Sequence, residues 1–164
     1  MLREGVPEVT FYGFTKDNNK RATDQREAFT QACLDAVTLL SQKDATLFIV
    51  GNTHSKAFPP ELLPFANQRI SFGRGGIHVN FLVNYDWEWD MKMIQETGSI
   101  ASAEIPRVDL IIRWGGRQRL SGFLPVQSVY ADFYTLDALW PDFCDQHFHD
   151  AMDWFQSCDV TLGG

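Results

Sequence analysis

Short apolar runs and longer amphipathic segments alternate along the chain. The apolar runs are rich in β-branched and aromatic residues, and several hold almost no polar position. Such runs are typical of strands covered on both faces, as in a parallel sheet. The expected strands are residues 9–14, 45–51, 77–85, 107–114 and 130–136.

Between these runs, apolar residues recur at helical spacing. The expected helices are residues 23–42, 59–68, 86–97 and 141–157. In the first helix the apolar stripe consists of Ala28, Ala32, Ala36, Val37 and Leu40. Thr23 or Asp24 can cap its amino end. The alternation predicts an α/β fold with a mostly parallel central sheet flanked by helices. We find no linker or repeat, so residues 1–164 are expected to form a single domain.

Composition and charge narrow the class of protein. Hydrophobic residues make up 45% of the chain, and the formal net charge is -7. A broad basic face is therefore not expected, which argues against a nucleic-acid partner. No run approaches the roughly 20 apolar residues of a membrane span, so any membrane contact is expected to be peripheral. The three cysteines, Cys33, Cys144 and Cys158, are far apart and odd in number, which favours reduced thiols in a cytoplasmic protein.

One basic loop stands out in this acidic chain, RWGGRQRLSG at residues 113–122. It follows an expected strand, and ligands in α/β sheets bind at the carboxyl ends of strands. Its two glycines allow the backbone to approach a ligand closely, and its three arginines offer forked donors for phosphate oxygens. These residues are Gly115, Gly116, Arg113, Arg117 and Arg119. We expect Ser121 to donate its hydroxyl and to begin a helix, whose amino end favours anions. The loop predicts a diphosphate cradle; the alternative is a surface loop whose arginines pair with carboxylates.

Residues 108–143, VDLIIRWGGRQRLSGFLPVQSVYADFYTLDALWPDF, resemble the signature of the cis-prenyltransferases, the undecaprenyl diphosphate synthase family. That signature runs roughly Asp-Leu-x-Ile-Arg-Thr-x-Gly-Glu-x-Arg-x-Ser-Asn-Phe-Leu, then Tyr-Ala-Glu-x-Tyr, then Leu-Trp-Pro-Asp-Phe. Residues 10–22 and 76–91 resemble two further family segments in the expected order. The resemblance covers most of residues 5–157.

The resemblance implies a reaction and a set of ligands. The family joins isopentenyl diphosphate to an allylic diphosphate with Z geometry and releases diphosphate, using Mg²⁺. Arg113, Arg119 and Ser121 match the positions that grip the diphosphate of isopentenyl diphosphate. Asp132 stands where the family has a glutamate that helps to hold Mg²⁺. The family works as dimers, so a homodimer is expected, with a heteromer as the alternative.

A second group of residues comes from the resemblance of residues 10–22. Asn18 matches an asparagine near the reacting carbon, and Arg21 and Thr15 match further polar positions of that motif. Tyr12 and Phe14 would line the floor of the active site.

The chain also departs from the family pattern. It contains no Asp-Gly-Asn-Gly-Arg-Trp loop, which in the family cradles the allylic diphosphate. Trp114 replaces a threonine, Arg117 a glutamate and Asn19 a tryptophan. We therefore expect a partial domain, truncated at its amino end. Either its coding sequence was started at an internal methionine, or the chain is a natural partial subunit.

Three functions remain open. The leading hypothesis is a cis-prenyltransferase-type domain that binds isoprenoid diphosphates with Mg²⁺ and is weak or inactive by itself. The alternatives are a non-catalytic partner subunit of a heteromeric prenyltransferase and a generic phosphate-ester-binding protein. The expected location is the cytoplasm, with the membrane surface as an alternative.

Other polar and aromatic residues have ordinary explanations. Four histidines, His54, His78, His147 and His149, are expected to be structural or exposed. His147 and His149 are two residues apart on a helix and point to different faces, which is poor spacing for metal ligands. Asn52 ends a strand and either turns the chain or touches substrate. Trp87 and Trp89 either cover an apolar surface or contact a prenyl chain.

Overall fold

A computed structural model describes residues 5–15 and 23–159 of the chain. The strands are β1 (Glu8–Thr15), β2 (Ala45–Val50), β3 (Arg69–Phe72), β4 (Ile77–Tyr85), β5 (Leu110–Trp114) and β6 (Asp132–Leu136). The helices are α1 (Thr23–Ser41), α2 (Trp87–Thr97) and α3 (Asp145–Ser157), with the 3-10 helices η3 (Pro60–Phe65) and η4 (Trp140–Asp142). The chain divides into two compact units, Met1–Ile105 and Pro106–Gly164. The predicted α/β class with mostly parallel strands is confirmed.

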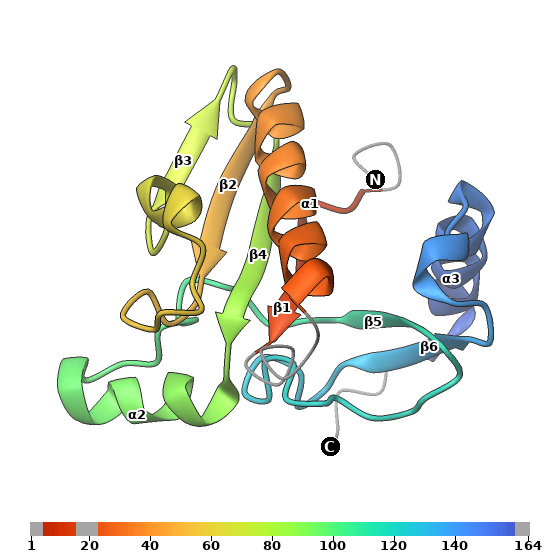
Figure 1. Ribbon diagram of the computed structural model, residues 1–164. Helices are drawn as coiled ribbons and strands as arrows, with labels where there is room; N and C mark the ends of the chain where they lie inside the picture. The colour runs from red at the N-terminus through yellow and green to blue at the C-terminus, as the bar shows by residue number, and fades with distance from the viewer. Residues whose placement is uncertain (1–4, 16–22, 160–164) are drawn as a thin grey trace. The chain divides into compact units, whose positions relative to one another are not determined.

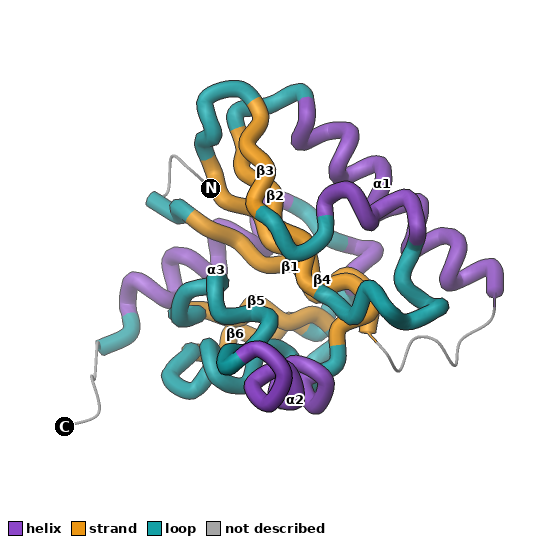
Figure 2. The backbone as a smooth tube through the Cα atoms, turned by 90° about the vertical axis from the view of Figure 1, so that its left-hand side faces the viewer, coloured by secondary structure: helices purple, strands orange, loops and turns teal. Residues whose placement is uncertain are grey.

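The first unit is built on a four-stranded sheet in the order β1-β4-β2-β3. Strands β1, β4 and β2 are parallel, and β3 runs antiparallel to β2. Every residue of β2 is buried, as predicted for a strand covered on both faces. Helix α1 lies along one face of this sheet (Figures 1 and 2). The buried core at that face consists of Cys33, Val37, Leu47, Ile49, Phe58, Leu62, Val79, Phe81 and Val83.

The stripe predicted for α1 is only partly correct. Val37 is buried, and Ala36 and Leu40 pack against the core, but Ala28 and Ala32 are exposed. Cys33 takes the buried position instead. Apolar residues occur on more than one side of this helix, and its bulkier side chains bury more apolar area against the sheet than alanines would. The side chain of the predicted cap Thr23 lies outside the described part, and Asp24 lies in the first turn.

The segment between β2 and β4 differs from the prediction. The helix expected over residues 59–68 is a shorter 3-10 helix, η3, and Pro64 lies inside it. A proline there has no N–H to donate and clashes with the preceding turn, so an α-helix does not form. The next residues form β3, an antiparallel edge strand that the sequence pattern does not predict.

The second unit contains the parallel pair β5 and β6, with Leu110 opposite Asp132 and Trp114 opposite Leu136. Helix α3 contacts both strands through its partly buried residues. Four aspartates on or near this helix are exposed, and they are Asp142, Asp145, Asp150 and Asp153. None of the described helices is long and apolar enough to cross a membrane.

Candidate functional site

The arginine loop, residues 113–122, leaves the carboxyl end of β5. Arg113 is the last residue but one of β5 and lies opposite Thr135 of β6. Its Nη1 donates a hydrogen bond to the backbone oxygen of Arg119, and its Nη2 donates to Ser121 Oγ at 3.1 Å. The structure therefore brings together three residues predicted for the diphosphate cradle. The Arg113 guanidinium joins the start of the loop to its end.

The two glycines turn the loop and hold it against the end of β6. Gly115 and Gly116 both have positive φ angles, 85° and 62°. Their backbone N–H groups donate to the oxygens of Ala138 and Leu136, at 2.9 and 2.8 Å. A Cβ atom on Gly116 would lie only 2.7 Å from Asp137 Oδ1. Both positions therefore favour glycine for conformation, and Gly116 favours it for space as well.

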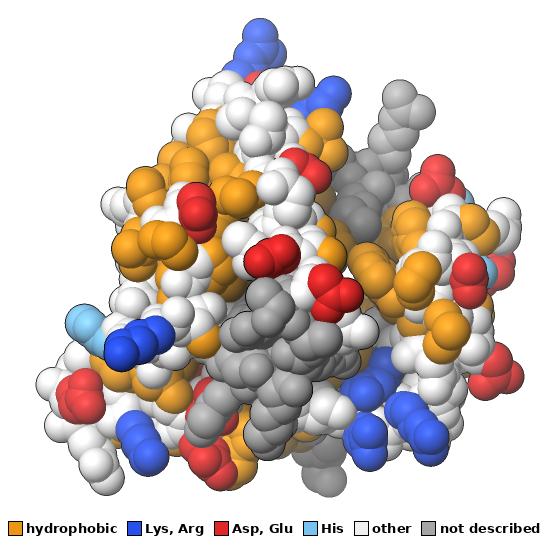
Figure 3. Space-filling model, viewed as in Figure 1, with side chains coloured by type: hydrophobic (Ala, Val, Ile, Leu, Met, Phe, Trp, Pro, Cys, Tyr) orange, Lys and Arg blue, Asp and Glu red, His pale blue; other side chains and the backbone are white. Residues whose placement is uncertain are grey.

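The side chains of the other two arginines of the loop are exposed to solvent. Arg117 and Arg119 are exposed, and neither guanidinium forms an ion pair or hydrogen bond with a described residue. Elsewhere in the second unit, Arg107 forms an ion pair with Asp109, at 3.7 Å. Basic side chains gather over the β5–β6 segment, at the lower right of Figure 3. Arg117 and Arg119 therefore do not match the alternative prediction, which was a surface loop whose arginines pair with carboxylates.

The helix predicted to begin at Ser121 does not form. Ser121 and Leu124 have positive φ angles, 51° and 35°, and residues 121–130 form turns. Left-handed residues interrupt a right-handed helix, and Pro125 removes one backbone donor. The positive potential of a helix amino end, expected beside the arginines, is therefore absent from residues 121–130, and the arginine side chains carry the positive charge of the loop.

Asp132, the predicted metal ligand, is the first residue of β6 and is exposed. It lies opposite Leu110, three residues before Arg113, an offset of about 10 Å along the strand. Its carboxylate makes no hydrogen bond or ion pair within the described part of the chain. No group of three acidic, histidine or cysteine side chains that could hold a metal ion occurs among residues 5–15 and 23–159.

The predicted residues of the second motif belong to the first unit. Tyr12 lies in β1, and its ring meets that of Tyr85 edge-on, with the ring centres 6.2 Å apart. The pairing of β1 with β4 is irregular between Tyr12 and Phe14 and again between Phe14 and Thr15. Thr15 is the last residue of the strand. Asn18, Arg21 and the side chain of Phe14 lie outside the described part of the structure.

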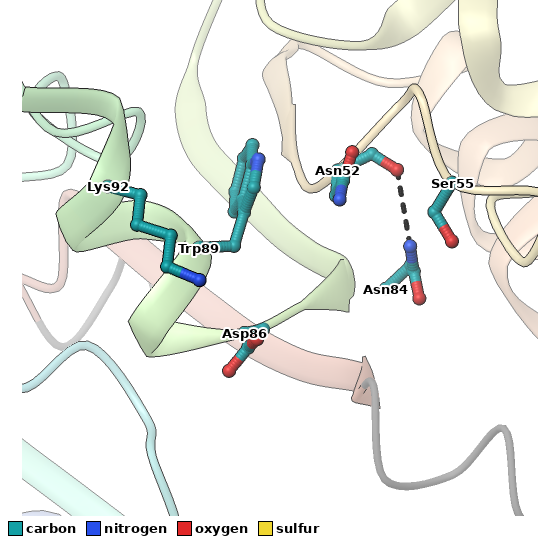
Figure 4. A pocket seen from close by; sticks show the side chains of 6 residues that line it. All are labelled: Asn52, Ser55, Asn84, Asp86, Trp89 and Lys92. Carbon is teal, nitrogen blue, oxygen red and sulfur yellow. Dashed lines mark hydrogen bonds between the residues drawn. The ribbon is translucent and has the colours of Figure 1, made fainter. Parts of the chain in front are cut away.

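A polar pocket opens at the carboxyl ends of β2 and β4, with a volume of about 220 Å³. Figure 4 shows the side chains that surround it, from Asn52, Ser55, Asn84, Asp86, Trp89 and Lys92. Asn84 Nδ2 donates to the backbone oxygen of Asn52 at 3.2 Å, and Asp86 caps α2. Of these residues, the sequence pattern predicted only Asn52 and Trp89 as possible substrate contacts. The others could have been found because two neighbouring parallel strands are both followed by polar turn residues.

A buried network fixes helix α2 beside this pocket. Asp90 accepts hydrogen bonds from Tyr85 Oη at 2.7 Å, from Ser102 Oγ at 2.6 Å and from Ser102 N at 3.0 Å. All three residues are at most 1% exposed. Burial, and then the bond to Asp90, raises the pKa of Tyr85 above its ordinary range, so the phenol stays protonated as a donor. Trp89 packs edge-on against Tyr85, while Trp87 is 45% exposed.

An aromatic cluster lies in the second unit next to the arginine loop. Trp114 contacts Trp140 edge-on, with ring centres 4.7 Å apart, and also packs against Phe143. His147 Nδ1 accepts from Trp114 Nε1 and from the N–H of Cys144, each at 3.4 Å. The structural role expected for His147 is therefore confirmed. Trp140 and Leu139 remain more than half exposed.

The chain matches known proteins along nearly its whole length. A family described as "Putative undecaprenyl diphosphate synthase" matches residues 1–163. The chain is 31% identical to an isoprenyl transferase of Nitrosomonas europaea, over 99% of this chain and 70% of that one. It is 28% identical to the ditrans,polycis-undecaprenyl-diphosphate synthase ((2E,6E)-farnesyl-diphosphate specific) of Escherichia coli K12, over 98% of this chain and 73% of that one.

Two solved structures share the fold. A probable undecaprenyl diphosphate synthase from Campylobacter jejuni superposes with a TM-score of 0.76 at 18% identity, covering 99% of this chain and 86% of that chain. Lavandulyl diphosphate synthase from Lavandula x intermedia, in complex with dimethylallyl diphosphate, gives a TM-score of 0.78 at 20% identity, covering 98% and 80%.

Proposed function

Because the chain belongs to the undecaprenyl diphosphate synthase family of prenyltransferases, we propose that its arginine loop binds isoprenoid diphosphates. The reaction proposed for the site is the Z-selective joining of isopentenyl diphosphate to an allylic diphosphate. One observation carries the proposal: two exposed arginines of this loop have no carboxylate partner among the described residues. Unpaired guanidinium groups at the carboxyl end of a strand are suited to phosphate oxygens.

The names of the relatives support this class of substrate. The Escherichia coli relative is specific for farnesyl diphosphate, and the lavender enzyme holds dimethylallyl diphosphate in its crystal. Both compounds combine a diphosphate with an apolar chain. A loop rich in arginine suits the first part of such a molecule, and aromatic side chains suit the second.

Each predicted residue has a proposed role. Arg113, Arg119 and Ser121 form the loop that holds the diphosphate of isopentenyl diphosphate, where positive charge balances the charge of the ligand. The product keeps this diphosphate, and the diphosphate that leaves comes from the allylic substrate. Asn18, from the second group of predicted residues, is proposed to lie near the reacting carbon. The remaining residues of that second group, with proposed roles in binding or lining, are Arg21, Thr15, Tyr12 and Phe14.

Asp132 is the residue proposed to hold Mg²⁺. Magnesium at phosphate sites commonly takes one or two protein carboxylates and completes its shell with phosphate oxygens and water. A single exposed carboxylate without a protein partner therefore fits this ion. When bound, the ion would neutralise charge on the diphosphate. Arginine side chains are cationic and cannot be ligands of Mg²⁺, so Asp132 is the proposed protein ligand of the ion.

The proposal includes a low turnover for this sequence. It contains no Asp-Gly-Asn-Gly-Arg-Trp loop, so we expect weak condensation or none, together with measurable binding of isopentenyl diphosphate. The expected assembly is a homodimer in the cytoplasm, with contact at the membrane surface as an alternative location.

The test measures binding and product formation separately. The chain is incubated with isopentenyl diphosphate, farnesyl diphosphate and Mg²⁺, with bound ligand measured by equilibrium dialysis and product by radiolabel. Replacing Arg119→Ala should weaken binding of isopentenyl diphosphate about tenfold or more, because a charge-assisted hydrogen bond is lost. The matched control is Arg107→Ala, since Arg107 is already paired with Asp109 and stacked over Tyr130. If the chain binds no isopentenyl diphosphate, or the Arg119 variant binds it unchanged, the proposal is wrong.

A second candidate is a non-catalytic partner subunit of a heteromeric prenyltransferase. It is favoured by large apolar side chains that remain exposed on the second unit, among them Tyr130 at 64% and Trp140 at 53%. Exposed apolar groups of this size commonly mark protein contacts. Retained ligand binding with no product by this chain alone, and product when a full-length relative is added, would favour this candidate.

A further inference from the structure

The walls of the polar pocket at the carboxyl ends of β2 and β4 are fixed by contacts within the first unit. Asn84 is 3% exposed, and its Nδ2 donates to the backbone oxygen of Asn52, which ties the two strand ends together. On the α2 side, the ring of Trp89 meets that of Tyr85 edge-on, with ring centres 6.3 Å apart. The next residue, Asp90, anchors the helix through three buried hydrogen bonds. Both walls are therefore formed before a ligand arrives, as in most small-molecule sites.

Much of the acceptor capacity of this pocket is used by the protein itself. Each of three lining side chains accepts a hydrogen bond from the backbone N–H two residues further along the chain. The acceptors are Asn52 Oδ1 and Ser55 Oγ, both at 3.2 Å, and Asp86 Oδ1, at 3.3 Å. A ligand that mainly donates hydrogen bonds would have to compete with these local turns.

The donors of the pocket are in a different state. Within the described part of the chain, no protein group accepts from the Lys92 ammonium, from Trp89 Nε1 or from Asn52 Nδ2. Lys92 and Trp89 are three residues apart on α2, so they share one face of the helix. Figure 4 shows both on the α2 side of the pocket, with Asn52 across from them. A pocket with these free donors suits a ligand that is rich in acceptors.

The charges at the pocket narrow the class of that ligand. Lys92 supplies one positive charge, whereas Asp86 places a negative charge at the same pocket. An anion with two charges, such as phosphate near neutral pH, is attracted by the first and repelled twice over by the second. A carboxylate carries one charge and accepts at two oxygens, which suits an ammonium next to neutral N–H donors. The indole of Trp89 offers an apolar surface to a carbon skeleton, and a volume of about 220 Å³ limits the ligand to a small molecule.

We propose that the polar pocket binds a small organic carboxylate, whose oxygens accept hydrogen bonds from Lys92, Trp89 and Asn52. The ligand reaches the pocket from solvent, because Lys92 is exposed and Trp89 is only half-buried. This site goes beyond the proposed function, since none of its residues has a role there. It is a second ligand site in the chain, for a chemical class other than isoprenoid diphosphates.

The experiment titrates the isotope-labelled full chain with benzoate, benzamide and benzylamine, and follows N–H signals by nitrogen–proton NMR. The three probes share one ring and differ in charge. Each tryptophan gives one indole N–H signal, and that of Trp89 is identified by its loss in Trp89→Phe. Benzoate should move this signal and the side-chain amide signals of Asn52. Benzamide should bind about tenfold more weakly, because it lacks the charge, and benzylamine should not bind.

Four variants test the contacts. Lys92→Gln should weaken benzoate binding about tenfold or more, because a charge-assisted hydrogen bond is lost. The matched control is Lys56→Gln, an exposed lysine that does not line the pocket, and it should change the affinity less than about twofold. Asn52→Asp keeps the oxygen that accepts locally and replaces the free NH₂ group by a charged oxygen, so it should abolish binding. Asp86→Asn removes the opposing charge and keeps a good helix cap, so it should tighten binding about threefold.

The signals outside the pocket report whether each variant is folded, so the outcomes can be read directly. The proposal is wrong if benzoate moves no signal of Trp89 or Asn52, or if Lys92→Gln binds it unchanged. A preference for benzylamine would also overturn it, because Asp86 would then be the binding group. Orthophosphate that binds as tightly as benzoate would overturn the assignment to carboxylates. A chain that binds benzoate in this way but no isopentenyl diphosphate would support this site and refute the proposed function, and the reverse result would refute this site alone.

Discussion

Replacing Asp90→Ala should destabilise the first unit more than most single changes would. The carboxylate of Asp90 is 1% exposed and accepts three hydrogen bonds, from Tyr85 Oη, Ser102 Oγ and Ser102 N. These bonds join β4, α2 and the turn at residue 102. Alanine removes the acceptor and leaves all three donors buried, which costs more than the bonds themselves contribute.

The magnitude follows from the number of donors. A hydrogen bond to a charged group contributes about 1.5–3 kcal/mol, and each donor left buried and unsatisfied costs about 1–3 kcal/mol. Water entering the cavity recovers part of this loss, so we expect about 3–5 kcal/mol for Asp90→Ala, in the range for removing one partner of a buried charged contact. Asp90→Asn should cost less, because its amide oxygen can still accept from Ser102 N.

The assay must be local, since the two units of the chain need not unfold together. Amide hydrogen exchange at Ser102 reports the network directly, because that N–H bonds to Asp90 Oδ1. Exchange there should accelerate in Asp90→Ala, and urea unfolding should shift to lower concentration. The control is Glu96→Gln, an exposed change on the same helix that should stay within about 0.5 kcal/mol. A loss below about 1 kcal/mol for Asp90→Ala, with Ser102 exchange unchanged, would refute the network.

Two further predictions concern the core of the first unit. Gly51→Ala should lower stability by about 3 kcal/mol in urea unfolding, because its Cβ would lie 1.6 Å from the backbone oxygen of Val83; a neutral effect would contradict that packing. Burial raises the pKa of Cys33 to about 11, so the neutral thiol is favoured in the fold. Iodoacetamide at pH 8 should therefore label Cys33 far more slowly than exposed Cys144, as measured by peptide mass spectrometry. Equal labelling of the two cysteines would contradict the burial of Cys33. The stability that the buried thiol contributes should fall as pH rises from about 9 toward 11.

Much of the fold could be predicted from periodicity, because burial on both faces leaves continuous apolar runs. The strand predicted at residues 77–85 is β4 with the same bounds, and the helix predicted at residues 86–97 differs from α2 only at Asp86, which caps it. Strand β3 was missed because four residues at a sheet edge give too short a pattern. The buried side of α1 was chosen wrongly in part, because spacing alone cannot say which of two apolar sides meets the sheet.

The residue types of the candidate site could be predicted from the sequence, but their arrangement in space could not. The residue types of the arginine loop and its place after a strand pointed to phosphate chemistry. The contact between Arg113 and the end of the loop could not be foreseen, since it depends on successive left-handed residues at Gly115 and Gly116 and again at Ser121. The same backbone conformation removed the helix expected there. The pocket lined by Asn84 and Lys92 required knowledge of which strands are neighbours.

The two edge strands of the four-stranded sheet differ in how many residues they offer for pairing with a further strand. On one side β3 is four residues long and runs antiparallel to its neighbour, so it offers a short ladder to any incoming peptide. On the other side β1 is eight residues long and, among the described residues, pairs only with β4 within this sheet. Any chain that extends this sheet by pairing along its backbone would accordingly gain most by joining alongside β1.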